Sequence, residues 1–168
     1  LDPLDAACAR FVQATRDARV IGLGEATHGQ HEAFELKRKL TMALVADGLD
    51  VVAFEASATA ARSCDDYVSG RSDDINLGMR GLGMSIWNIE ENEALLRDLR
   101  AWNDAHQKDG RVRFVGVDVQ DSQATCARIK ELLGTSAGDL GDKFTNWISR
   151  LEPAIGELWS GKPEAYEK

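Results

Sequence analysis

Short apolar runs alternate along the chain with longer stretches in which apolar residues recur every three or four positions. Apolar runs of this length between turn signals are typical of buried strands, whereas the three-to-four spacing is typical of amphipathic helices. The pattern therefore predicts an α/β protein. The expected strands are Arg19–Gly24, Val51–Phe54 and Val112–Val117.

The helix after the first predicted strand has the clearest signals. Leu36, Leu40 and Leu44 fall on one face at helical spacing. Thr27 and Gln30 have the spacing of a capping box, which predicts that the helix begins near His28. The expected helices are 4–17, His28–Ala46, Ser57–Tyr67, Asn88–Gln107, Gln123–Leu133 and Lys143–Leu151. The glycine-rich segment Gly70–Trp87 has poor periodicity and is expected to be mostly irregular, with one short helix.

An acidic residue follows each of the three predicted strands. Strands that alternate with helices indicate βαβ units and a parallel, largely buried sheet. Right-handed crossovers bring the carboxyl ends of such strands to one edge. The sequence therefore predicts a parallel sheet of βαβ units flanked by helices, with an active-site crevice at the carboxyl ends of the strands. The acids expected in that crevice are Glu25, Glu55 and Asp118.

Composition narrows the class of protein. The 168 residues are 43% hydrophobic and 29% charged, which is enough for one domain with a core, and we expect residues 1–168 to form a single α/β domain. The net charge of -8 argues against a nucleic-acid partner. Three widely spaced cysteines, Cys8, Cys64 and Cys126, indicate reduced thiols. No apolar run is long enough to span a membrane, so we expect a soluble, cytoplasmic protein with no membrane partner.

The histidine beside the first strand is the candidate for a catalytic base. At the first turn of a helix, His28 would feel the positive end of the helix dipole, which favours a neutral imidazole. Glu25, three residues earlier, could orient the ring or share a water molecule. Alternatively, His28 is a partly exposed polar residue and Glu25 accepts backbone hydrogen bonds in a turn. The residues alone leave both interpretations open.

Three other motifs are incomplete. Gly22-Leu23-Gly24 begins like a dinucleotide-binding turn, but Thr27 stands in place of the third glycine. The segment 31–35 resembles half of a zinc-protease helix, but its second histidine is replaced by a glutamate. The segment 134–138 matches a nucleophile elbow but follows a helix instead of a strand. We therefore expect no cofactor and no metal, although His28, Glu25 and Glu55 could still converge on a divalent ion.

Several motifs together resemble the erythromycin esterase family. They are GEATHG at 24–29 followed by Glu32, Phe34 and Leu36, VVAFEA at 51–56, WNIEENEALLRDLRAWN at 87–103 and FVGVDVQ at 114–120. By this resemblance, His28 is the water-activating histidine and Glu25 and Glu55 are active-site glutamates. Lys37 falls where characterised esterases carry an arginine, and these two cations are not interchangeable.

The resemblance implies a hydrolase that opens a macrolide lactone, a carboxylic ester, through histidine-activated water and without a covalent intermediate. The catalytic residues would be His28, Glu25 and Glu55. The residues expected to bind the small-molecule ester or lactone are Lys37, His31, Trp87 and Asp118. The alternative is a related protein that binds a small molecule or saccharide precursor without cleaving it.

The resemblance also concerns how much of the domain is present. The family supplies a further histidine from its carboxyl-terminal half, and nothing in this sequence corresponds to that half. The chain starts without a methionine and stops in a charged stretch. We therefore expect residues 1–168 to be the amino-terminal part of a longer domain, inactive as an esterase without the remaining carboxyl-terminal half as partner.

Overall fold

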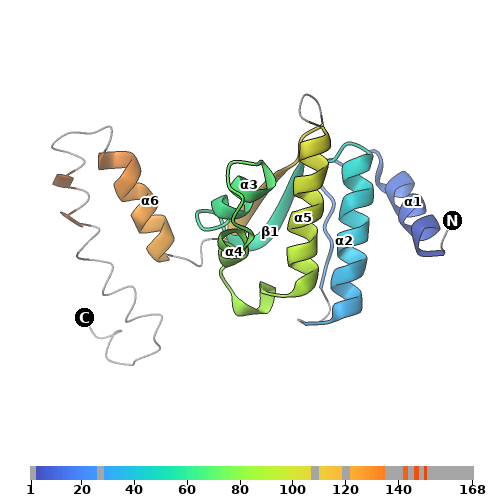
Figure 1. Ribbon diagram of the computed structural model, residues 1–168, viewed down its shortest axis with the longest axis horizontal. Helices are drawn as coiled ribbons and strands as arrows, with labels where there is room; N and C mark the ends of the chain where they lie inside the picture. Colours follow the sequence, from blue (N-terminus) through green and yellow to red (C-terminus); the bar gives the residue numbers. More distant parts are fainter. Residues whose placement is uncertain are drawn as a thin grey trace. The chain divides into compact units, whose positions relative to one another are not determined.

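The structure is a computed structural model that describes residues 3–25, 29–106, 110–118 and 122–134, together with 142–143, 146–147 and 150. It divides into two compact units, Leu1–Val117 and Asp118–Lys168, which are described separately. The helices and strands are α1 (Pro3–Thr15), α2 (His31–Ala46), β1 (Val51–Ser57), α3 (Arg62–Val68), α4 (Ile75–Arg80), the 3-10 helix η1 (Ser85–Trp87), α5 (Glu90–Ala105), β2 (Arg113–Asp118) and α6 (Ser122–Gly134) (Figure 1).

The sheet in the described part of the chain consists of β1 and β2, which run parallel. The connection between them carries α3, α4, η1 and α5, as a parallel pair requires. The coarse prediction of an α/β protein with two of its strands is therefore confirmed. β1 continues to Ser57, three residues beyond the predicted end, because Ala56 and Ser57 are buried in the same way as Val52.

The first predicted strand is not a strand in the structure. Residues 19–24 do not form a strand and lie outside the two-stranded sheet. Val20 is 89% exposed, and nothing lies near the positions that a side chain would occupy at Gly22 or Gly24. An apolar run becomes a strand only where a partner strand pairs with its backbone, and glycine weakens the preference further. The prediction for Arg19–Gly24 was wrong for this reason.

The helix predicted from His28 begins at His31. Gly29 has a φ of +78°, outside the right-handed helical region, and Gln30 is the N-cap but makes no side-chain capping bond. Ala26, Thr27 and His28 lie outside the described residues. The predicted end at Ala46 is confirmed.

Helices α1, α2 and α5 pack side by side (Figure 1). α5 begins two residues after the predicted Asn88, with Ile89 as N-cap. Its buried leucines join residues from α2, β1, α3 and β2 in one core. The largest fully buried side chains are Phe114, Leu82, Leu96, Leu99, Val68, Val112, Asn103 and Cys64.

The segment predicted as irregular contains α4 and η1. The side chain of Asp74 caps α4 by accepting a hydrogen bond from the backbone N–H of Leu77 at 3.1 Å. A Cβ atom on Gly81 would lie 2.7 Å from the carbonyl oxygen of Ala60. A glycine at position 81 thus allows the end of α4 to approach the chain just before α3. The expected short helix is α4, and the 3-10 helix η1 is additional.

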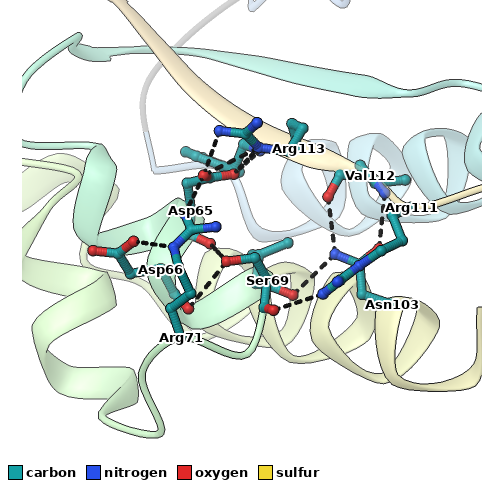
Figure 2. Close-up of polar contacts among 10 residues, drawn as sticks. Asp65, Asp66, Ser69, Arg71, Asn103, Arg111, Val112 and Arg113 are labelled. Carbon is teal, nitrogen blue, oxygen red and sulfur yellow. Dashed lines mark hydrogen bonds and ion pairs between the residues drawn. The ribbon is translucent and has the colours of Figure 1, made fainter. Parts of the chain in front are cut away.

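A buried carboxylate fastens β2 to α3 (Figure 2). Asp65 is 4% exposed and accepts hydrogen bonds from Arg71 at 2.6 Å, from Arg113 at 2.7 Å and from the backbone N–H of Phe114 at 3.0 Å. Burial acts to raise the pKa of Asp65, but the bonds from Arg113, Phe114 and Arg71 outweigh it and lower the pKa. The charge is therefore kept inside the fold because it is fully paired.

Asn103 makes the corresponding connection from α5 to the chain just before β2. Its side-chain oxygen accepts from the N–H of Val112 at 2.8 Å, and its amide donates to the carbonyl oxygen of the same residue at 2.8 Å. A second amide hydrogen bond reaches the carbonyl of Val68 at 2.9 Å. Because these hydrogen bonds are buried, Asn103 fixes the position of β2 against α5 and α3.

The second unit contains α6, which confirms the predicted helix Gln123–Leu133 to within a residue at each end. The helix predicted at Lys143–Leu151 and the loop after Gly134 fall mostly outside the described residues. Cys8 and Cys64 are free thiols, as predicted. Among the described residues, no helix is both long and apolar enough to cross a bilayer.

Candidate active site

A cavity of about 570 Å³ lies in the first unit. Its walls are the extended segment 18–25, strand β1, and the facing sides of α2 and α5. The sequence predicted a crevice at the carboxyl ends of the strands, but the cavity instead runs along β1. The absence of strand pairing by residues 19–24 explains this shape, because the space beside β1 is left open. The charged and aromatic side chains on the wall include Glu25, Phe34, Lys37, Phe54, Glu55, Trp87 and Glu91.

Glu25 and Lys37 form an ion pair on the cavity wall. Lys37 Nζ lies 3.4 Å from Glu25 Oε2, and the two side chains are 22% and 17% exposed, respectively. The same ammonium group lies 4.8 Å from the centroid of the Phe34 ring. A mostly buried cation held by a carboxylate and an aromatic face is a fixed positive charge that a polar ligand can meet.

Aromatic rings form the apolar part of the wall. Trp87 packs edge-on against Phe54 with ring centroids 5.3 Å apart, and against Phe34 at 6.0 Å. Trp87 is only 2% exposed, so its ring is fixed by the surrounding core. The cavity thus combines a rigid apolar surface with a few charged groups, as small-molecule sites do.

Glu55 reaches the cavity from β1. It lies on the more exposed face of the strand, between the partly buried Phe54 and the buried Ala56. In the described part of the chain, Glu55 makes no ion pair and no side-chain hydrogen bond. Its carboxylate is therefore available to hold a water molecule or a substrate group.

His31 and Glu91 join the amino-terminal ends of α2 and α5 through a short contact between His31 Nδ1 and Glu91 Oε1. The Glu91 side chain is 11% exposed and lines the cavity, whereas the imidazole is 72% exposed. The hydrogen bond that His31 donates to Glu91 raises the pKa of His31. The pKa of Glu91 is lowered chiefly by a hydrogen bond from the backbone N–H of Glu91 itself, and secondly by the hydrogen bond from His31.

The structure brings together four of the residues predicted for the site: Glu25, Glu55, Lys37 and Trp87 all line the cavity. His31 contacts the cavity only through Glu91. His28 lies outside the described residues, and Asp118, the half-buried last residue of β2, begins the second unit. The catalytic and substrate-binding roles of all these residues stay predictions.

Sequence reasoning missed Glu91 and Phe34 as cavity residues. Both belong to the motifs that carry the family resemblance, but neither was predicted to line the site. The available signal was the cluster of acids Glu90, Glu91 and Glu93 in the first turn of α5, which is typical of helix starts and so pointed to capping alone. In the described part of the chain, no three His, Cys, Asp or Glu side chains are grouped to hold a metal ion.

These features define an α/β protein with an acidic, aromatic-walled cavity beside its sheet. Comparison with known families matches residues 45–168 with the erythromycin esterase family, so the chain belongs to that family. A solved structure of a Bacillus cereus protein superposes with a TM-score of 0.61 at 22% identity and covers 92% of this chain. The chain spans 41% of that protein's length. No curated protein matches significantly.

Proposed function

We propose that the complete protein is a hydrolase that opens a carboxylic ester, in particular a macrolide lactone, with water activated by His28. The observation that carries the proposal is the presence of Glu25, Lys37 and Glu55 on the wall of one cavity. Membership of the erythromycin esterase family supports hydrolase chemistry. In the sequence, His28 lies between Glu25 on the cavity wall and the start of α2 at His31.

In the proposed reaction His28 removes a proton from a water molecule as the water oxygen attacks the ester carbonyl carbon. Glu55 holds the water, and Glu25 orients the imidazole. The carbonyl oxygen becomes an oxyanion, and the Lys37 ammonium group lies in the same cavity to stabilise that charge. Breaking the bond between carbon and the alkoxy oxygen gives a carboxylic acid and an alcohol. The alcohol takes its proton from the imidazolium, and the acid releases its own proton to solvent to become a carboxylate.

The apolar part of a substrate would rest on the rings of Trp87, Phe54 and Phe34. A cavity of about 570 Å³ is in the usual range for small-molecule sites. The remaining carboxyl-terminal part of a complete family domain would supply further groups, so we expect residues 1–168 alone to show little turnover. His31 and Asp118 remain proposed contacts with the substrate.

The test is incubation of the full-length protein with a macrolide lactone in ¹⁸O-labelled water, followed by mass spectrometry. We expect a product heavier than the lactone by one labelled water molecule. Tight binding of the intact lactone with no product would favour a non-hydrolytic binding protein and contradict the proposal.

A further inference from the structure

Helices α2 and α5 begin at the same end of the first unit (Figure 1), and two ion pairs join them. His31 contacts Glu91, and Arg38 contacts Asp98. Both pairs connect residues sixty positions apart. The equal offset follows from two parallel helices in fixed register, and the pairs are separated by seven residues, or about 10 Å along the helices.

The two pairs differ in how they respond to pH. Arg38 is held by Glu35 at 2.8 Å as well as by Asp98, and a guanidinium stays charged at every pH at which proteins fold. An imidazole titrates near neutral pH. Only the pair at the beginning of the two helices, next to the cavity, can therefore lose its charge under ordinary conditions.

The charged groups around His31 favour the imidazolium. Glu91 faces it from α5, and Glu32 and Glu35 act from its own helix, all three raising the pKa. The positive end of the α2 dipole opposes the imidazolium. Glu25, the acid nearest in sequence on segment 18–25, is paired with Lys37. Glu91 is thus the partner on which the charge of His31 chiefly depends.

We propose that His31 and Glu91 form a pH-sensitive latch that holds the start of α2 against α5 and thereby sets the position and charge of Glu91 on the cavity wall. Glu91 lines the same cavity as Glu25, Lys37 and Glu55, so a change in its position or charge acts on the proposed site. His31 is then a positioning residue for the proposed hydrolysis. This role rests on the proposed function, but the latch itself does not.

The latch is closed when Glu91 is ionised and His31 is protonated. Because the pKa of His31 is raised, closure persists above the ordinary histidine value of about 6.5 and is lost as the pH rises through the folded value. Deprotonation leaves Glu91 as an unneutralised carboxylate on the cavity wall. At acidic pH the latch opens only when Glu91 becomes protonated. Because the pKa of Glu91 is lowered, this occurs below the ordinary glutamate range.

The first test uses no substrate. Histidine-labelled full-length protein is titrated by NMR, and the resonances of His31 are assigned with His31→Gln. We expect the His31 pKa to fall toward about 6.5 in Glu91→Gln and to stay unchanged in Asp98→Asn, which removes the neighbouring pair. Equal His31 pKa values in the wild type and in Glu91→Gln would overturn the latch.

The second test reads the effect on catalysis with p-nitrophenyl acetate as substrate. His31→Gln should lower kcat roughly tenfold or more at neutral pH, because small displacements of reacting groups are costly. His31→Lys keeps a cation and should restore activity while moving the alkaline fall of kcat to higher pH. The same alkaline fall in His31→Lys and in the wild type would overturn the positioning role. Absence of hydrolysis in the wild type, together with a normal NMR result, would contradict the proposed function alone.

Discussion

Lys37 Nζ lies 3.4 Å from Glu25 Oε2, which brings the cation of α2 to the carboxylate at the end of the extended segment 18–25. Both side chains are mostly buried, and both line the cavity. The carboxylate sets the position of the ammonium group, and the ammonium group offsets the charge of the carboxylate. This relationship joins two residues twelve positions apart on one wall of the cavity.

The first prediction concerns the charge of Lys37. Lys37→Met removes the cation proposed to stabilise the oxyanion, and we expect kcat/KM for ester hydrolysis by the full-length protein to fall roughly 100-fold. Lys37→Arg keeps the charge and should retain most activity, with KM changed more than kcat because the donor geometry differs. Lys39→Met is the matched control, since Lys39 lies on the same helix but lines a different groove. Unchanged kinetics in Lys37→Met would remove this residue from the mechanism.

The second prediction concerns stability. Asp65→Asn takes away the charge that holds Arg71 and Arg113, and we expect a loss of about 1.5 to 3 kcal/mol in the free energy of unfolding, measured in urea. Asp66 is the control: its side chain is 44% exposed and contacts Arg71 alone, so Asp66→Asn should cost less than about 1 kcal/mol. Similar losses in the two variants would contradict the role of the buried cluster.

The Asp65 cluster also predicts how stability depends on pH. Because its folded pKa is lowered, the stabilisation from Asp65 is fully present above the unfolded value of about 3.9. It is lost as the pH falls through the folded value. Urea unfolding at a series of acidic pH values should therefore show a steeper decline for the wild type than for Asp65→Asn. Parallel curves would show that this carboxylate does not titrate with unfolding.

The third prediction concerns the close approach of β2 to β1. A Cβ atom on Gly116 would lie 2.4 Å from the carbonyl oxygen of Ser57 and 2.5 Å from that of Ala56. Gly116→Ala should therefore destabilise the full-length protein by about 1 to 3 kcal/mol, because backbone atoms must shift. Gly22→Ala is the control, since nothing lies within 4 Å of its added carbon. Unfolding temperatures that fall equally, or not at all, would contradict the geometry of the sheet.

The fourth prediction concerns the thiol of Cys64. It is fully buried and donates a hydrogen bond to the carbonyl of Gly78 at 3.0 Å, and burial raises its pKa to about 12. Iodoacetamide at pH 8 should leave Cys64 unmodified in the native protein and modify it in urea, as read by peptide mass spectrometry. Modification in the native protein at the unfolded rate would show that α3 opens from the core.

The sequence predicted what depends on local pattern. The predicted strands Val51–Phe54 and Val112–Val117 correspond to β1 and β2, and the long periodic helices α2 and α5 were found as well, all with small errors at their ends. The run at 19–24 has the same local appearance but pairs with no strand. Strand pairing is a property of distant segments, and no local pattern encodes it.

Only part of the site was predicted, because local pattern does not show contacts between distant segments. The acids Glu25 and Glu55 stood out because each follows an apolar run, and both line the cavity. Glu91 and the buried Asp65 cluster could not be found, since their importance comes from contacts across α2, α3, α5 and β2. A carboxylate in a helix shows nothing in sequence about the partner that meets it.

The most direct test of the proposed function is the turnover of a macrolide lactone by full-length His28→Asn, with His106→Asn as the control. The His106 ring stacks on Trp102 with centroids 3.9 Å apart and does not line the cavity. If His28 is the base, kcat of His28→Asn should fall at least about 100-fold while the fold and the stability are kept, and His106→Asn should match the wild type. Near-normal turnover by a folded His28→Asn variant would contradict the mechanism.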